Sequence, residues 1–379
     1  MRIAHFAPRI GAAGGISTYI RRLGQAQLER GCDVRYCCFV EPDSGAFPPE
    51  RVEVVENDRA LFHRARRLEV DVLHLHRAVS HLPEERVTTV RTMHGHQGGC
   101  PSASRYLSRP GKPCDRSYTV AGCLWGHFVD RCGSVRPQQL TSNFRRIHHE
   151  MSLAAVVPTY TVSEFIKQQM IRAGCAKENL TTIPSPAPAV AHEWTPVPDD
   201  GVPRFLYLGR LVPQKGLEWL LRAFSEVEAP ARLDVAGEGP QEDGMRRLAR
   251  ELNITGNVIF HGWVGSKQVE DLMRQARAVV FPSMWHEPAG LVSLEAAAYG
   301  RPVIASRSGG IPEYALPSFA TLVEPGDADG MADAIHSLAT DRSLANRCGK
   351  EGRREAKDTF SMNQFVDRVE KWYNSASNQ

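Results

Sequence analysis

Two carboxylates in the segment of residues 279–313 have a spacing and a setting that suit ligand chemistry. Glu287 lies in a loop after a buried-strand pattern, and Glu295 lies in the helix that follows, before a second strand and a Gly-Gly turn. Amides at a helix N-terminus favour an anion, and ionised carboxylates accept hydrogen bonds from hydroxyl groups. The segment therefore predicts a ligand with both an anion and hydroxyls, as in a nucleotide sugar. Without this context the two residues would be ordinary helix charges.

A basic pair, Arg210 and Lys215, occupies the turn after the strand-like run RFLYLG, between Gly209 and Gly216. At the mouth of a cleft, two cations could neutralise a diphosphate leaving group as its charge grows during bond cleavage. On an open surface the same residues would be unremarkable. The flanking glycines favour the first interpretation.

A second glycine-containing loop, RIGAAGGIST, joins the first strand-like run to the first helix-like run. Gly14 and Gly15 would let the backbone approach a ligand without an intervening side chain. They lack the full G-x-G-x-x-G spacing of a dinucleotide site. We therefore expect a loop that faces the ligand cleft, without a nicotinamide or flavin cofactor.

Composition limits the class of protein. The 379 residues, 42% hydrophobic and 23% charged, suffice for two globular domains of roughly 150 to 200 residues each. No apolar run approaches the ~20 residues that span a bilayer, and MRIAHFAP reads as a strand and turn rather than a signal peptide. Nine cysteines in such a chain indicate reduced thiols or a metal site rather than a disulfide framework. We expect a cytoplasmic protein, either free or peripheral at the inner face of the membrane.

Charge is divided unevenly along the chain. Residues 1–190 hold 25 Lys or Arg against 17 Asp or Glu, and the remainder holds 21 against 26. A basic first half suits an anionic acceptor or an anionic membrane surface, although solvated arginines would explain it equally well. No Lys/Arg-rich run is interleaved with aromatic residues, which argues against nucleic acid.

Strand-like and helix-like runs alternate along the chain, which indicates parallel sheets covered by helices. The alternation stops in the Pro-rich stretch 183–203 and then resumes. We predict a first domain at 1–185 with an insertion at 97–146, a linker at 186–203 and a second domain at 204–358. The segment 359–379, with an amphipathic helix at 360–373, is expected to cross back to the first domain. In this α/β class, two doubly wound, Rossmann-like domains face each other and bind a ligand in the cleft between them.

The runs GRLVPQKG, VAGEGP and EPAGLVSLE give the chain a specific resemblance. It resembles the retaining glycosyltransferases of the GT-B fold, in particular glycosyltransferase family 4, strongly over 204–325 and weakly over about 97–150. The resemblance implies transfer of a sugar from a nucleotide-diphosphate sugar, a UDP-sugar before a GDP-sugar, to an acceptor hydroxyl, with retention at the anomeric carbon. The acceptor would be a saccharide, a lipid-linked glycan or a small natural product, and no metal or other cofactor is required. In the front-face mechanism of such enzymes, the leaving phosphate accepts the proton of the acceptor.

The resemblance also implies residue roles. Arg210, Lys215, Glu287 and His94 would form the catalytic set, with His94 at a strand end that faces the donor sugar. His74, His76 and His96 are weaker candidates. The implied donor-binding set is Gly14, Gly15, Gly209, Gly237, Glu238, Val264, Gly290, Leu291, Val292 and Glu295. Two alternatives share this pattern: a sugar-nucleotide 2-epimerase of the same fold and a non-catalytic nucleotide-sugar-binding module.

Metal binding has two candidate motifs. Cys100, Cys114, Cys123 and Cys132 could hold a structural zinc in the insertion, but the spacing lacks a C-x-x-C pair, so separate or redox-linked thiols remain the alternative. Asp327-Ala328-Asp329 matches the D-x-D pattern of other glycosyltransferases, yet it opens a helix where an Asp is an ordinary cap. We expect the insertion to shape acceptor specificity.

Overall fold

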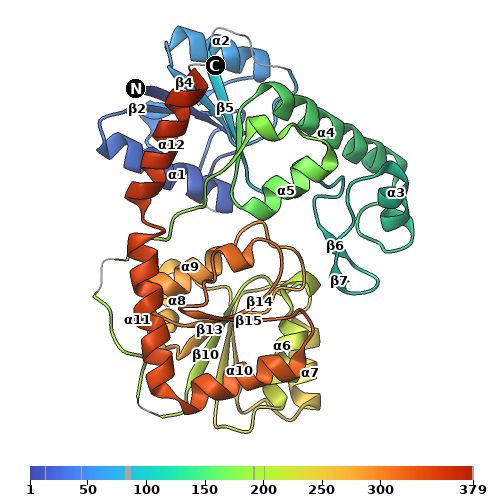
Figure 1. The fold of residues 1–379 in the computed structure, drawn as a ribbon, viewed down its shortest axis with the longest axis vertical. Helices are drawn as coiled ribbons and strands as arrows, with labels where there is room; N and C mark the ends of the chain where they lie inside the picture. The colour runs from blue at the N-terminus through green and yellow to red at the C-terminus, as the bar shows by residue number, and fades with distance from the viewer. Residues whose placement is uncertain (13, 44, 82–86, 191–192, 200, 378–379) are drawn as a thin grey trace.

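Two α/β lobes stack along the long axis of the molecule, and after a helix that runs along the second lobe the last helix lies against the first (Figure 1). The computed structural model describes residues 1–379 except 13, 44, 82–86, 191–192, 200 and 378–379. Each lobe contains one parallel sheet with helices on both faces, because the strands are short apolar runs that must be buried on both sides. The expected fold class, two Rossmann-like domains, is confirmed. None of the described helices is long and apolar enough to cross a bilayer.

The first lobe has a seven-stranded parallel sheet in the order β3-β2-β1-β4-β5-β8-β9. Its strands are β1 (Arg2–Phe6), β2 (Asp33–Cys38), β3 (Val52–Val54), β4 (Val72–Leu75), β5 (Thr88–Met93), β8 (Thr159–Thr161) and β9 (Leu180–Thr182). Its helices are α1 (Gly15–Glu29), α2 (Asp58–Arg67), α4 (Pro137–Val156) and α5 (Glu164–Ala173), with single turns η1 (Pro49–Arg51) and η3 (Lys177–Asn179). Ser163 caps α5 by accepting a hydrogen bond from the amide of Ile166 at 3.2 Å.

Between β5 and α4, residues 94–136 leave the sheet and form a segment with little regular structure, called the excursion below. It contains η2 (His96–Gly98), the antiparallel pair β6 (Tyr106–Leu107) and β7 (Lys112–Pro113), and α3 (Val120–Phe128). This excursion projects from the side of the first lobe (Figure 1). Residues 183–203 then lead to the second lobe, and those that the structure describes form neither helix nor strand.

The second lobe repeats the plan with a six-stranded parallel sheet in the order β12-β11-β10-β13-β14-β15. Its strands are β10 (Arg204–Leu208), β11 (Arg232–Ala236), β12 (Val258–Gly262), β13 (Ala278–Phe281), β14 (Val303–Ser306) and β15 (Ala320–Val323). Its helices are η4 (Pro213–Lys215), α6 (Leu217–Ser225), α7 (Glu242–Glu251), α8 (Ser266–Gln275), α9 (Leu291–Ala298), η5 (Ile311–Glu313), α10 (Ala328–Thr340) and α11 (Arg342–Asp358).

The last helix, α12 (Met362–Ser377), leaves the second lobe and packs on the first (Figure 1). Phe365, Val366, Val369 and Tyr373 form its inner face, and all four are buried. They join one hydrophobic cluster with residues of α1, β1, β4, β5 and β8. The helix is therefore part of the core of the first lobe.

Candidate active site

The centre of the candidate site is an ion pair between the turn after β10 and the loop after β13. Lys215 Nζ lies 2.6 Å from Glu287 Oε1, and the two side chains are 20% and 7% exposed. Ser283 Oγ donates a second hydrogen bond to the same carboxylate oxygen at 2.6 Å. The ammonium group also lies over the rings of Phe281 and Trp285, at 5.7 and 5.6 Å from their centroids. One acidic and one basic group are thus fixed together in a half-enclosed position.

Two glycines hold the backbones of this pair in place. Gly216 follows Lys215 with a φ of 71°, and a Cβ there would lie 1.8 Å from the carbonyl oxygen of Pro282. Gly309 has a φ of 61°, and a Cβ there would lie 2.4 Å from the carbonyl oxygen of Glu287. Both positions need a left-handed backbone and no side chain. The glycines therefore allow the loops after three strands to lie in direct contact.

Arg210 lies in the same turn as Lys215, but its side chain is exposed. Among the described residues, no ion pair or side-chain hydrogen bond restrains it. Its carbonyl oxygen accepts a hydrogen bond from Tyr207 Oη at 3.1 Å. The pKa of Tyr207 is raised, mainly by burial and secondarily by the negative charge of Glu287. Tyr207 thus lies beneath both the basic turn and the carboxylate, and the guanidinium of Arg210 is available for a ligand.

The N-terminus of α9 opens next to this pair. Gly290 is its N-cap residue, no side chain caps the helix, and Leu291 is 42% exposed. Backbone amides of a first turn have no partners within the helix. The amide groups at this end can therefore donate to an anion.

Glu295, further along α9, faces the first lobe across a cavity of about 180 Å³. Gly15, Tyr19 and Arg22 line the same cavity from the first lobe, together with Leu291 from α9. Burial raises the pKa of Glu295, and the charge of Arg22 opposes that shift. The structure thus brings the glycine loop of the first lobe and the second carboxylate to one inter-lobe space.

Direct contacts close the cleft beside the ion pair. His96 Nε2 donates to the carbonyl oxygen of His286 at 2.6 Å, and Ser163 Oγ donates to that of Pro288 at 2.6 Å. His286 Nε2 lies 2.8 Å from Asp115 Oδ1, which belongs to the excursion between β5 and α4. The excursion therefore reaches the loop that carries Glu287.

A second clasp joins η5 to the start of α5. The carboxylate of Glu313 accepts hydrogen bonds from the amides of Glu164 and Phe165 at 2.6 and 2.8 Å. A carboxylate is favoured at a helix N-terminus by the helix dipole as well as by the two amides. The lobes are thus joined in a closed arrangement on both sides of Glu287.

Histidines form a continuous buried chain in the first lobe. His5 Nε2 contacts Gln27 Oε1 at 2.7 Å, His5 Nδ1 contacts His76 Nε2 at 3.0 Å, and His76 Nδ1 contacts His94 Nε2 at 3.0 Å. The ring of His94 also packs edge-on against Tyr19, with centroids 4.7 Å apart. Burial, followed by the charges of Arg77 and Arg91, lowers the pKa of His94 to about 3. His94 is therefore a neutral imidazole at physiological pH.

The chain also fixes the tautomers. Because the amide oxygen of Gln27 can only accept, His5 donates from Nε2 and accepts at Nδ1, and His76 and His94 repeat this pattern. His94 then donates from Nε2 and keeps Nδ1 as an acceptor. His74 stands beside the chain, with Tyr373 Oη and Thr92 Oγ1 each 2.6 Å from a ring nitrogen.

Some of the site residues predicted from the sequence contact the loop of Glu287 in the structure, and others do not. No described contact joins His94 to the loop of Glu287, whereas His96, ranked lower, lies against that loop. Gly209 and Glu238 belong to adjoining turns, in which the amide of Leu211 donates to the carbonyl oxygen of Glu238 at 2.9 Å. The remaining donor candidates in this lobe occupy three places: Gly237 contacts the backbone of Gly209, Val292 is half-buried in α9, and Val264 packs on the core beside β12. Sequence reasoning missed Tyr207, Ser283, Asp115 and Glu313.

The metal candidates also have defined surroundings. The four cysteines at 100, 114, 123 and 132 are free thiols, and among the described residues they form no group of three whose ligand atoms all lie within 4.8 Å. His5, His74 and His76 do form such a group, but each of their ring nitrogens already has a hydrogen-bond partner. The side chain of Asp327 caps α10 by accepting from the amide of Gly330 at 3.0 Å.

Comparisons with known proteins place the chain in a family. Residues 13–188 match the family model described as Glycosyltransferase Family 4, and residues 192–355 match the one described as Glycosyl transferases group 1. An uncharacterized glycosyltransferase of Bacillus subtilis, YqgM, is 29% identical over 69% of this chain and 72% of its own. A GDP-mannose-dependent phosphatidylinositol monomannoside mannosyltransferase of Mycolicibacterium smegmatis is 29% identical over 64% of this chain and 66% of its own. Several other curated relatives match over 40% to 52% of their own length.

The solved structures give the fold. Anabaena HepE, crystallised with UDP, superposes with a TM-score of 0.70 at 16% identity and covers 99% of this chain and all of its own. The two matched ranges, residues 13–188 and 192–355, correspond to the two lobes, each with its own parallel sheet. The chain therefore belongs to the family 4 glycosyltransferases of the GT-B fold.

Proposed function

We propose that this protein transfers a hexosyl unit from a nucleoside-diphosphate sugar to an acceptor hydroxyl with retention at the anomeric carbon. The observation that carries the proposal is the Lys215–Glu287 pair, held beside the open N-terminus of α9 and enclosed by contacts between the lobes. A cation and helix amides suit a diphosphate, and a carboxylate suits sugar hydroxyls. The closed cleft excludes water that would otherwise hydrolyse the donor.

Each group has a role in this reaction. The bond between the anomeric carbon and the diphosphate oxygen breaks, a bond to the acceptor oxygen forms on the same face, and the acceptor proton passes to the leaving phosphate. Lys215 and Arg210 offset the negative charge that grows on the diphosphate. Glu287 orients the donor sugar through its hydroxyls, and Glu295 accepts hydrogen bonds from the ribose. His94 accepts a hydrogen bond from a sugar hydroxyl at Nδ1, as its fixed tautomer allows.

The donor is a uridine nucleotide sugar, and the cations and helix amides replace a divalent metal at the diphosphate. HepE, which shares the fold, was crystallised with UDP, whereas the mycobacterial relative is GDP-mannose-dependent. UDP-sugars and GDP-sugars are therefore compared directly in the test. The acceptor belongs to glycan, glycolipid or natural-product glycoside synthesis. Peripheral contact with an anionic membrane fits the basic first lobe.

The test begins with a panel of UDP- and GDP-sugars in a thermal-shift assay, since a true donor stabilises the folded protein by mass action. Nucleotide release is then measured with candidate acceptors, and the anomeric configuration of the product is read by NMR. We expect Glu287→Gln to lower turnover by roughly 10² to 10³, the loss seen when one preorganised polar contact is removed. Glu228→Gln, the same change at an exposed residue of the second lobe, is the control.

Three outcomes would oppose the proposal. An inverted product would remove the retaining mechanism. Epimerised sugar formed from donor alone would identify a 2-epimerase. Strong stabilisation by a nucleotide sugar, with no nucleotide released to any acceptor in the panel, would indicate a binding module.

A further inference from the structure

The first lobe contains a cavity of about 760 Å³ at the carboxyl ends of its central strands. The loop after β1, the residues after β4 and helix α4 each contribute one arginine to it: Arg9, Arg77 and Arg146. Gly15 lines both this cavity and the inter-lobe cavity that holds Glu295. The two spaces are therefore adjacent.

Among the described residues, none of these three arginines forms an ion pair, and no side-chain hydrogen bond holds Arg9 or Arg77. Arg146 donates to a backbone carbonyl, and its Nε is buried without a partner. The acidic side chain that lines the cavity is Glu150, which is buried and already paired with Arg91 of β5. Arg91 itself keeps two buried nitrogens, Nε and Nη1, without a hydrogen bond.

Arg77 lies within electrostatic range of Glu150 and of two other arginines, Arg146 and Arg91. Burial lowers the pKa of Arg77, and the charges of Arg146 and Arg91 lower it further, against the opposing effect of Glu150. The side chains of Arg9 and Arg77 are exposed and that of Arg146 is half-buried, so an incoming anion can reach all three. Guanidinium groups match the geometry of phosphate oxygens with paired hydrogen bonds.

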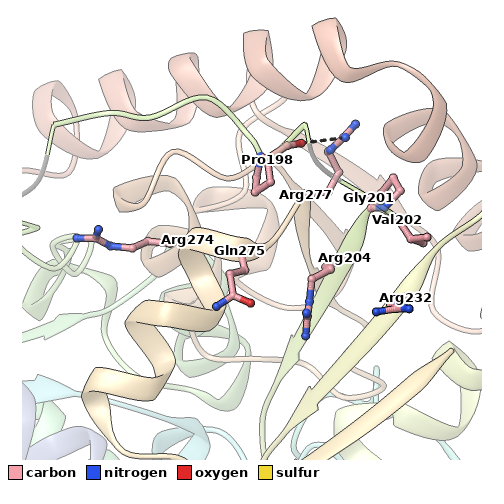
Figure 2. Close-up of a pocket in the computed structure, with 9 residues that line it drawn as sticks. Pro198, Gly201, Val202, Arg204, Arg232, Arg274, Gln275 and Arg277 are labelled. Carbon is pink, nitrogen blue, oxygen red and sulfur yellow. Dashed lines mark hydrogen bonds between the residues drawn. The ribbon is translucent and has the colours of Figure 1, made fainter. Parts of the chain in front are cut away.

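A second basic cavity provides a comparison. It has a volume of about 350 Å³ and lies at the amino ends of β10 and β11, the edge of the sheet opposite Lys215 (Figure 2). There Arg204 makes two 2.7 Å hydrogen bonds to the carboxylate of Asp234, and Arg277 donates to the carbonyl oxygen of Pro198 at 3.2 Å. Those two arginines serve the structure of the lobe. In the described part of the first lobe, Arg9 and Arg77 have no such partners, so the comparison singles out the first cavity as a place for a ligand.

The first-lobe cavity also adjoins the histidines. Arg77 directly follows His76, and Gln97, which lines the cavity, directly follows His96. The charge of Arg77 contributes to the lowered pKa of His94, so the two groups lie within electrostatic range. An anion held here would sit beside the neutral imidazole rather than at the diphosphate end of the donor.

We propose that this cavity binds an acceptor through a phosphate group, held by Arg9, Arg77 and Arg146. The role of the bound molecule as an acceptor rests on the proposed transferase function, whereas phosphate binding in the first lobe does not. A phosphate on a soluble sugar and a phosphate in a lipid headgroup present the same oxygens, so the experiment has an arm for each.

The soluble arm uses calorimetry in the presence of saturating UDP, which occupies the diphosphate position, and compares glucose 6-phosphate with glucose. We expect measurable affinity for the phosphorylated sugar alone, and a loss of roughly tenfold or more in each of Arg77→Gln and Arg146→Gln, since a charged hydrogen bond is removed. Arg172→Gln, an exposed arginine of α5, is the matched control and should bind normally. UDP affinity should be unchanged in all three variants, which also shows that they fold.

The lipid arm uses cosedimentation with vesicles of phosphatidylglycerol against vesicles of phosphatidylcholine, with the same variants. Retention on phosphatidylglycerol that the cavity variants lose, without a matching effect of glucose 6-phosphate, assigns the phosphate to a lipid. Equal binding of glucose and glucose 6-phosphate, together with vesicle binding that ignores both substitutions, would overturn the proposal. If phosphate binds through these arginines but no nucleotide is ever released, the phosphate site stands and the transferase function fails.

Discussion

Acidification should destabilise the first lobe of this protein well above the pH at which carboxylates titrate. The reason is a set of five histidines, His5, His74, His76, His94 and His96, of which all but the half-buried His94 are at most 3% exposed. Burial is the main cause that lowers each pKa, to about 4 for His5, to about 3 for His94 and His96, and well below the ordinary value for His74 and His76. The folded state therefore keeps all five neutral at a pH where the unfolded chain would protonate them.

The sign and size of the effect follow from linkage. A histidine in the unfolded chain takes up its proton near pH 6.5, so the unfolded state binds more protons and stability falls as the pH drops from there towards the folded pKa values. Between pH 7.5 and 5.5 each histidine contributes a loss of about 1.4 kcal/mol, or about 7 kcal/mol for five. That loss is as large as the whole stability of a marginal domain, which is roughly 5–15 kcal/mol.

Hydrogen–deuterium exchange of the β4 and β5 peptides measures this locally, which suits a two-domain protein that need not unfold in one step. After correction for the intrinsic exchange rate, we expect the opening free energy to fall by about 7 kcal/mol between pH 7.5 and 5.5. His5→Asn should remove about a fifth of the loss, and His63→Gln, at an exposed position of α2, should leave it intact. Opening free energies that agree within about 1 kcal/mol across this range would refute the reasoning.

The remaining predictions concern the site. Gly309→Ala places a Cβ against the backbone of Glu287 at a φ of 61°, so nucleotide release should fall at least tenfold while a thermal-shift assay still reports a folded protein; normal turnover would show that the loop relaxes freely. Glu313→Gln weakens the clasp at the start of α5, so small-angle scattering should report a larger radius of gyration, and an unchanged radius would mean that the other contacts suffice. Turnover should survive a chelator, because Lys215 and Arg210 supply the charge at the diphosphate; restoration of lost activity by Mg²⁺ would contradict this. Elemental analysis should find less than one zinc per chain, and stoichiometric zinc would show that the cysteines of the excursion are ligands.

Much of the fold was predictable because the signal is local. Each strand is a short apolar run, each helix follows with an amphipathic pattern, and Ser163 and Asp327 were recognisable as caps from their position alone. The proximity of Lys215 and Glu287 was less accessible, since 72 residues separate them. It follows from sheet order: β10 and β13 are neighbours in the sheet, so the turns after them must adjoin. The resemblance to the glycosyltransferases, rather than the local pattern, placed Lys215 and Glu287 in one catalytic set.

The contacts within the histidine chain and those of the excursion could not be predicted from the sequence, for different reasons. His5, His76 and His94 come from β1 and from the ends of β4 and β5, which are neighbours in the sheet, so topology brings them near each other. Which ring nitrogens meet depends on strand register and side-chain rotamers, and no local pattern encodes these. The excursion between β5 and α4 has no hydrophobic periodicity to read. The contact of Asp115 with His286 therefore appeared only with the structure.

The packing of α12 has a consequence for biosynthesis. Tyr373 and Phe365 share a hydrophobic cluster with Ile3, Val72 and Val90, so the first lobe takes part of its interior from a helix that is translated after the second lobe. During synthesis the first lobe emerges before the second, yet a strip of its apolar surface stays uncovered until the ribosome has made α12. Chaperones therefore have access to this strip throughout translation of the second lobe.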